Sequence, residues 1–190
     1  MQNKRQMKKQ IYKWIFENLM GWKIEGSLDE QIKKSVLMVM PHTSWHDFYV
    51  AIICRGAIGV DINWVGKKEL FRFPFGYFFK SLGGAPLDRT GGLNKVESIV
   101  NIFNSKEIFR LGLSPEGTRK KVEQLKTGFY YIALKANVPI IPVSINFEKK
   151  VIAFGKPFYP TSDIESDLAI LNKHFVDAKG KIPEYGYKVP

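Results

Sequence analysis

The amino-acid sequence predicts an α/β fold, in which helices flank a central mixed sheet within a single domain. Apolar runs rich in β-branched residues alternate along the chain with amphipathic segments, as strands alternate with helices in such folds. The chain has 190 residues, of which 45% are hydrophobic, so one domain can bury a core of its own. No internal repeat or low-complexity block divides it.

The short apolar runs are the expected strands. The run over residues 35–40 closes at Pro41, which cannot continue a central strand. The motif over residues 138–143 is expected to be a buried core strand, whereas Gly83-Gly84 and Gly91-Gly92 are expected to form turns within a loop. The expected strands cover residues 35–40, 61–66, 107–114, 140–147 and 151–154.

The amphipathic segments are the expected helices. Thr43 or Ser44 can cap a helix that begins near Trp45. The aromatic run over residues 71–79 leaves two readings open, because it can pack the core or line a groove that faces an acyl chain or a membrane. The tail over residues 179–190 is expected to be extended or loose. The expected helices cover residues 4–20, 45–54, 75–82, 93–104, 127–136 and 163–177.

Residues 1–22 are expected to form a basic amphipathic helix that precedes a domain over residues 23–190. The first acidic residue, Glu17, follows a series of lysines and an arginine. This helix can pack on the domain, or it can lie on an anionic membrane surface. Its expected apolar face consists of Ile11, Ile15, Leu19 and Trp22.

The charge of the chain indicates an anionic partner. The formal net charge is +11 and the pI is about 9.6, which suits nucleic acid, an anionic membrane or a phosphorylated substrate. No apolar run reaches the roughly 20 residues that span a bilayer, and no secretory signal precedes Glu17. The single cysteine, Cys54, excludes an internal disulfide. We therefore expect a protein exposed to the cytoplasm, without a transmembrane helix or signal peptide.

His42 and Asp47 are the first candidates for chemistry. His42 follows an expected strand, and Asp47 falls in the first turn of the expected helix. A carboxylate at that position can fold back to accept the imidazole Nδ1–H, so that Nε2 faces a substrate hydroxyl. The sequence therefore predicts a His–Asp general base, while a turn that the two residues merely cap and solvate remains the alternative.

Two other chemistries use nearby residues. His42 and His46 stand four apart and, with Asp47, have a weak resemblance to a metal-ligand set. A serine nucleophile elbow would need the spacing G-x-S-x-G, which the segment Gly112-Leu113-Ser114-Pro115-Glu116-Gly117 does not have. No metal is expected.

Several motifs occur in an order that resembles the glycerolipid acyltransferase superfamily, and within it the lysophosphatidate (1-acyl-sn-glycerol-3-phosphate) acyltransferases. The resemblance covers approximately residues 34–158 and is specific because the motifs recur in order. They are the segment from His42 to Asp47, Gly66-Lys67-Lys68-Glu69-Leu70-Phe71, Gly84-Ala85-Pro86-Leu87-Asp88-Arg89, Ser114-Pro115-Glu116-Gly117-Thr118-Arg119 and Val138-Pro139-Ile140-Ile141-Pro142-Val143.

The resemblance implies a role for each motif residue. His42 would take the proton from the acceptor hydroxyl, and Asp47 would orient and stabilise the imidazolium. Arg89 and Arg119 would hold an acceptor phosphate, and Lys67 would add positive charge. Gly117 would permit close backbone approach, while Glu116 and Thr118 would shape the turn or bind the acceptor. Ser44 completes the expected substrate-binding set.

The resemblance also implies the reaction and its partners. A fatty acyl group would pass from acyl carrier protein or coenzyme A to a lysolipid hydroxyl, and 1-acylglycerol-3-phosphate would give phosphatidic acid. No cofactor beyond the thioester co-substrate is expected, and the enzyme would bind the cytoplasmic membrane face peripherally. The alternatives are a nonenzymatic module that binds nucleic acid or anionic lipid, and a metal-dependent hydrolase built on His42, His46 and Asp47.

Overall fold

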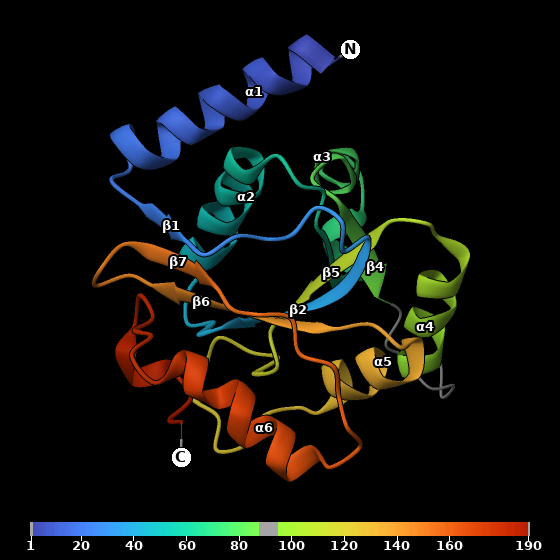
Figure 1. The fold of residues 1–190 in the computed structure, drawn as a ribbon. Helices are drawn as coiled ribbons and strands as arrows, with labels where there is room; N and C mark the ends of the chain where they lie inside the picture. The colour runs from blue at the N-terminus through green and yellow to red at the C-terminus, as the bar shows by residue number, and fades with distance from the viewer. Residues whose placement is uncertain (1, 88–94, 190) are drawn as a thin grey trace.

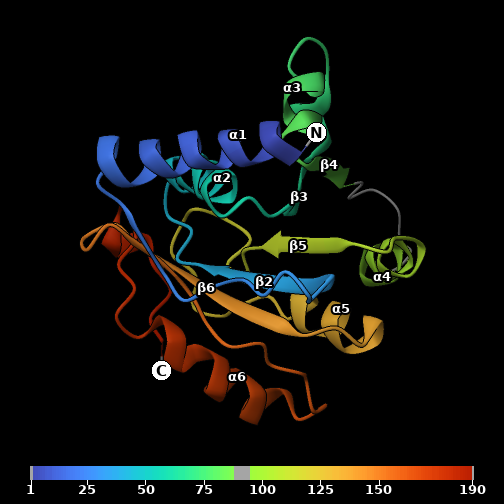
Figure 2. The ribbon, with the colours of Figure 1, turned by 45° about the horizontal axis from the view of Figure 1, so that its top comes forward.

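A seven-stranded mixed sheet, with helices on both faces, is formed by residues 2–87 and 95–189, the part of the chain that the computed structural model describes (Figures 1 and 2). The strand order is β1-β7-β6-β2-β5-β3-β4. Only the β6–β7 pair is antiparallel within this described sheet. The predicted fold class is thus confirmed. The strands are β1 (Lys23–Glu25), β2 (Lys34–Met40), β3 (Asn63–Lys67), β4 (Gly84–Leu87), β5 (Phe109–Leu113), β6 (Ile140–Asn146) and β7 (Val151–Phe154).

Helices form one layer on each side of the sheet. Figures 1 and 2 show α1, α2 and α3 on one side and α4, α5 and α6 on the other. Short 3-10 turns cover Lys68–Phe71, Lys173–Phe175 and Pro183–Tyr185. Within the described residues, no helix is both long enough and apolar enough to cross a membrane. The helices are α1 (Gln2–Trp14), continued by a π-helical turn (Ile15–Leu19), α2 (His46–Ile58), α3 (Gly76–Ser81), α4 (Lys95–Ser105), α5 (Gly128–Ala136) and α6 (Ile164–Asn172).

The two central strands divide the core between the layers. Along β2, Val36 and Met38 point into the cluster beneath α4 and α5, whereas Leu37 points into the cluster beneath α2. Ile140 and Ile141 of β6 divide in the same way. This alternation follows from the two-residue period of a strand, and it explains why the central strands are apolar on both faces.

Two short edge strands, β1 and β4, were not predicted from the sequence. The prediction of a turn at Gly83-Gly84 is wrong in its second residue, because Gly84 begins β4 and pairs with Trp64 of β3. Glycine and proline both weaken a strand pattern, and Pro86 is tolerated because β4 lies at the sheet edge. β1 has only three residues and no apolar alternation to mark it.

Most predicted helices are present with shifted ends. α2 continues past residue 54 to Ile58, where Gly59 adopts a left-handed conformation with φ of 71° and ends the helix. The helix predicted over residues 163–177 ends at Asn172 and continues as a 3-10 turn. The predicted start of the fourth helix at residue 93 lies outside the described residues, which resume at Lys95 in α4.

α1 packs on α2 through residues other than the predicted apolar face. Phe16 is fully buried and Tyr12 lies against Gly56 of α2, so the buried row runs through residues 12 and 16. Ile11 and Leu19 of the expected apolar face are exposed, and Trp22 is buried beyond the end of the helix. The chain therefore buries one apolar row of α1 and leaves another in solvent.

The C-terminal tail was expected to be extended or loose, and it is not loose: it lies against the core, with one 3-10 turn as its regular secondary structure. Pro183–Tyr185 forms a 3-10 turn, and the backbone N–H of Ile182 donates to Thr43 Oγ1 over 3.2 Å. Tyr187 and Val189 pack on the core cluster beneath α5. Local composition left an extended and a loose tail open, and these long-range contacts hold the tail in place.

Candidate active site

The candidate site lies at the carboxyl edge of two neighbouring parallel strands. β2 pairs with β5 in a register that sets Met38 opposite Leu113, so the segments that follow both strands leave the sheet side by side. The first segment carries His42, and the second carries Glu116 and Gly117. Loops at the carboxyl ends of parallel strands are where α/β folds place their ligands.

His42 and Asp47 form a close pair. The distance from His42 Nδ1 to Asp47 Oδ2 is 3.0 Å, and the exposed fractions of the two side chains are 28% and 4%. Asp47 lies in the first turn of α2 and is anchored, because its Oδ2 also accepts the backbone N–H groups of Thr43 (2.8 Å) and Ser44 (2.9 Å). A neutral His42 that donates Nδ1–H to this carboxylate keeps Nε2 free to accept a proton.

Glu116 holds the backbone of His42 from the second loop. Its Oε2 accepts the His42 N–H over 2.6 Å and the Ser114 hydroxyl over 3.2 Å, and its Oε1 accepts the Tyr187 N–H over 3.4 Å. Glu116 is only 1% exposed. Burial raises the pKa of this carboxyl above its ordinary value, although the bonds from His42, Ser114 and Tyr187 act in the opposite direction. This geometry favours the turn-shaping role of Glu116 over contact with an acceptor.

The turn after Glu116 exposes polar and basic groups. Gly117 adopts φ of +64°, and a Cβ there would lie 2.7 Å from Lys126 Nζ. The next residues, Thr118 and Arg119, are exposed, and Thr118 Oγ1 accepts the Lys120 N–H over 3.3 Å. The absent side chain of Gly117 thus lets a lysine amine approach the turn that carries Arg119.

Lys126 was missed as a functional candidate. It directly precedes the helix expected over residues 127–136; α5 begins at Gly128, and Thr127 makes no side-chain capping bond. The Lys126 N–H instead donates to the Pro115 carbonyl over 2.8 Å, which ties it to the Glu116 turn. No spacing rule predicts this approach, because it depends on the path of the whole 115–126 segment.

Ser44 and His46 form a separate contact beside the pair. Ser44 Oγ lies 2.8 Å from His46 Nδ1, and the His46 ring packs on Trp45 and Tyr49. Among the residues that the structure describes, no group of three His, Cys, Asp or Glu side chains is arranged to hold a metal ion. The contact with Ser44, a residue that is 8% exposed, orients the His46 ring.

The structure does not place the remaining basic candidates. Lys67 ends β3, but its side chain is not among those described, and Arg89 lies outside the described residues. Their predicted roles toward a phosphate remain predictions.

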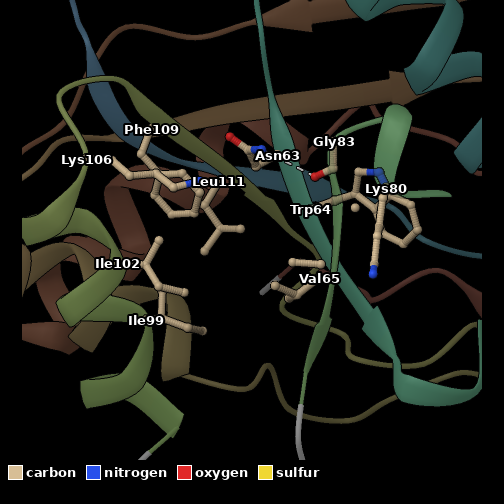
Figure 3. A pocket seen from close by; sticks show the side chains of 12 residues that line it. Asn63, Trp64, Val65, Lys80, Gly83, Ile99, Ile102, Lys106, Phe109 and Leu111 are labelled. Carbon is tan, nitrogen blue, oxygen red and sulfur yellow. Dashed lines mark hydrogen bonds between the residues drawn. The ribbon is translucent and has the colours of Figure 1, made fainter. Parts of the chain in front are cut away.

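A cavity of about 270 Å³ lies at a different part of the sheet (Figure 3). Phe109 and Leu111 of β5 and Ile99 and Ile102 of α4 give it apolar walls, and Lys106 stands at its side (Figure 3). Its strand residues come from the first halves of β3, β4 and β5, whereas the His42 pair follows the end of β2. The cavity is therefore not part of the candidate site.

The sequence matches acyltransferases both among protein-family models and among known proteins. The family model described as Acyltransferase matches residues 21–146. The chain is similar to 1-acyl-sn-glycerol-3-phosphate acyltransferases from Cocos nucifera, 30% identical over 138 residues, and from Escherichia coli strain K12, 37% identical over 89 residues. These alignments cover 68% and 43% of this chain but only 42% and 36% of those relatives.

A solved structure shares the fold. It is the 1-acyl-sn-glycerophosphate acyltransferase PlsC from Thermotoga maritima, with a TM-score of 0.60 and 18% sequence identity. The superposition covers 91% of this chain and 78% of that chain. At this identity the likeness supports the arrangement of sheet and helices.

Proposed function

This chain belongs to the acyltransferase family, and we propose that it transfers a fatty acyl group from an acyl thioester to the free hydroxyl of a lysolipid. The preferred acceptor in this proposal is 1-acylglycerol-3-phosphate, with phosphatidic acid as product, and the donor is acyl carrier protein or coenzyme A. The observation that carries the proposal is the 3.0 Å contact between His42 Nδ1 and Asp47 Oδ2 at the carboxyl edge of the sheet.

The pair can perform both proton transfers of this reaction. His42 Nε2 takes the proton of the acceptor hydroxyl while the hydroxyl oxygen bonds to the thioester carbonyl carbon. The resulting imidazolium is stabilised by the buried Asp47 carboxylate and then protonates the thiolate that leaves as the carbon–sulfur bond breaks. The thioester supplies the activated acyl group, so these steps need no metal and no prosthetic group. The products are the ester and a free thiol.

The exposed turn beside the pair supplies the acceptor phosphate site in this proposal. Arg119 is exposed there, and Lys126 reaches the neighbouring Gly117. A guanidinium can bind a phosphate through two parallel hydrogen bonds, and an ammonium adds charge without that geometry. Arg89 and Lys67 join this set on the strength of the family motifs.

The proposal also places the enzyme on the cytoplasmic face of a membrane, through α1. Met7, Ile11 and Trp14 are 57%, 52% and 58% exposed, and their spacing along the helix sets them on one stripe. Lysines at positions 4, 8 and 13 are exposed around this stripe. Apolar side chains bordered by cations are typical of helices that lie in the interface of an anionic leaflet.

A lipid assay tests this function. The protein is incubated with a panel of lysolipids and each thioester donor, and the products are identified by mass spectrometry. We expect the diacyl product from 1-acylglycerol-3-phosphate, with a rate that falls about 10²- to 10⁴-fold in His42→Ala. His46→Ala is the matched control, because this histidine lies in the same segment and is bonded to Ser44.

Two results would contradict the proposal. One is near-normal transfer by His42→Ala. The other is no acyl transfer to any acceptor together with a stoichiometric metal that is lost in His46→Ala, which would favour the hydrolase.

A further inference from the structure

An exposed apolar tip projects from the molecule between β3 and β4. We define the α3 tip as residues 70–78, which include the 3-10 turn end, the connection and the first residues of α3. Phe73 is 89% exposed, Tyr77 80% and Phe75 65%, and Leu70 and Phe78 are also exposed. So many large apolar side chains in one short segment form a patch rather than the scattered exposure normal for a soluble surface.

The α3 tip is held in shape by a packed aromatic base. Phe71 and Phe79 lie 6.3 Å apart between ring centroids, and both contact the indole ring of Trp64 on β3. Gly76 lies directly on the backbone of Phe71, where no side chain would fit. Because the first and last aromatics of the run are fixed inward by these contacts, the aromatic side chains between them are left in solvent.

The α3 tip lies on the same side of the sheet as α1. Figures 1 and 2 show α1 and α3 above the same face of the sheet, and in Figure 2 the loop next to α3 projects further from the sheet than α1 does. α1 and the α3 tip therefore lie on one side of the sheet, whereas α6 lies on the opposite side.

The charges around the α3 tip match an anionic surface. Arg72 and Lys80 are exposed within and beside it, against one exposed acid, Glu69. The basic residues of α1 extend the same positive character, with no acid before Glu17. Phenylalanine and tyrosine side chains bordered by cations favour the interface of an anionic leaflet, and a projecting tip can enter that interface without a complementary pocket.

We propose that the α3 tip inserts into an anionic lipid leaflet as a second membrane contact beside α1. Two contacts at separate points fix the orientation of the domain on the bilayer, which one helix alone leaves free to roll. The inference deepens the proposed function and rests on it for one premise, that the acceptor is a membrane lipid.

Labelling at a single cysteine tests insertion in the folded full chain. Cys54 is the only cysteine, it is buried, and burial raises the pKa of its thiol to about 12, so it does not compete for a thiol reagent. Tyr77→Cys therefore carries an environment-sensitive fluorophore at the α3 tip. Val176→Cys is the matched control, because Val176 is 66% exposed and follows α6 on the opposite side.

Vesicles of phosphatidylcholine with and without phosphatidylglycerol are then added. We expect a blue shift of the Tyr77→Cys label with the anionic vesicles and none for the Val176→Cys label. Equal responses from both labels, or no response from the first while the protein is vesicle-bound, would overturn the proposal.

Sedimentation gives a second measurement with unlabelled protein. Phe73→Ser/Phe75→Ser/Tyr77→Ser should lower the partition onto anionic vesicles about tenfold or more, since three large apolar side chains are lost from the interface. The control Ile170→Ser/Val176→Ser removes exposed apolar residues from the opposite side and should bind like the parent. Equal binding by all three proteins would refute insertion. A parent dimer that the triple variant abolishes, without any change in vesicle binding, would assign the α3 tip to a second copy of the chain instead.

The outcome is separable from that of the proposed function. A parent that binds vesicles through the α3 tip but forms no lipid product would leave the inference standing and remove the acyltransferase activity. A parent that acylates soluble acceptors while its labelled α3 tip stays in water would support the acyltransferase activity and refute insertion of the α3 tip.

Discussion

The connection from β2 to α2 and the connection from β3 to α3 both follow parallel strands, yet the first buries polar side chains and the second exposes apolar ones. After β2, the connection to α2 turns its polar groups inward, and Asp47 and Thr43 are 3% and 1% exposed. After β3, the connection to α3 turns its apolar groups outward, and Phe73 is 89% exposed. Both reverse the usual distribution of side chains between core and surface.

Each reversal forgoes folding free energy. Burying a carboxylate is costly unless hydrogen bonds compensate fully; Asp47 Oδ2 accepts two backbone N–H groups, but the buried Asp47 Oδ1 has no hydrogen-bond partner among the described residues. Leaving a large aromatic side chain in water forgoes roughly 1.5–3 kcal/mol of burial. The first arrangement orients a histidine, and the second presents an apolar surface, so the comparison separates a site for chemistry from a site for docking.

Replacing Asp47 tests the contact between His42 and the buried carboxylate of the β2–α2 connection. Asp47→Asn keeps the size of the side chain but removes the charge that stabilises an imidazolium at His42, so we expect turnover to fall on the order of 10²-fold. Steady-state kinetics measure this loss, and thermal unfolding checks that the fold survives. Turnover within a factor of two of the parent would show that the 3.0 Å contact is structural only.

Arg119→Lys tests whether the exposed turn beside that connection binds the acceptor phosphate. The substitution keeps the charge but removes the planar fork, so we expect the KM for a phosphate-bearing acceptor to rise about tenfold while the donor KM changes little. An acceptor without phosphate is the control. An equal rise for that acceptor would contradict phosphate binding by Arg119.

The backbone of the same turn is tested at Gly117. An alanine there must hold φ of +64° and displace Lys126, so Gly117→Ala should lower the free energy of unfolding by about 1–2 kcal/mol. Gly128→Ala is the matched control, since a Cβ at Gly128 meets nothing within 4 Å and alanine favours the helix that begins there. Urea denaturation compares them. Equal stability of the two variants would show that the left-handed conformation of Gly117 and its contact with Lys126 do not require glycine.

The smallest expected effect concerns the pH dependence of stability at Glu116. Burial raises the pKa of this carboxyl in the folded state above 4.5, so the unfolded chain releases the proton first as the pH rises. The stabilising contribution of Glu116 is therefore present below about pH 4.5 and is lost as the pH rises through the higher folded pKa.

Glu116→Gln should remove that loss. The stability of the variant relative to the parent should increase with pH across this window and then level off. Urea unfolding at a series of pH values measures the difference, with the exposed Glu184→Gln as the control for removal of one charge. A relative stability that falls as the pH rises would mean that the hydrogen bonds outweigh burial.

The sequence predicted the local part of the candidate site, and it named Glu116, but it did not predict the contacts between distant segments that support the site. His42 and Asp47 lie five residues apart across a strand-to-helix turn, so spacing alone brings them together. Glu116 reaches the His42 backbone across 74 residues, and the tail reaches both segments from the other end of the chain. Such contacts depend on how β2 and β5 pair, which no local pattern encodes.

The predictability of the fold divides in the same way, between local sequence signals and long-range contacts. The long buried strands β2 and β6 carry a strong apolar signal, whereas β4 contains glycine and proline and pairs only at the edge. In the aromatic run, the sequence could not separate Phe71 and Phe79, which pack on Trp64, from Phe73 and Phe75, which do not face the core. That division is set by tertiary contacts with β3.

Acyl transfer by two variants on two acceptors tests the separation of chemistry from docking most directly. The parent, His42→Ala and the triple serine variant of the α3 tip are each assayed with a short-chain soluble lysophosphatidate and with the same headgroup embedded in anionic vesicles. We predict that His42→Ala loses activity on both acceptors, while the α3 tip variant loses about tenfold on the vesicle acceptor alone. Substantial activity in His42→Ala, or an equal loss on both acceptors in the α3 tip variant, would contradict the account.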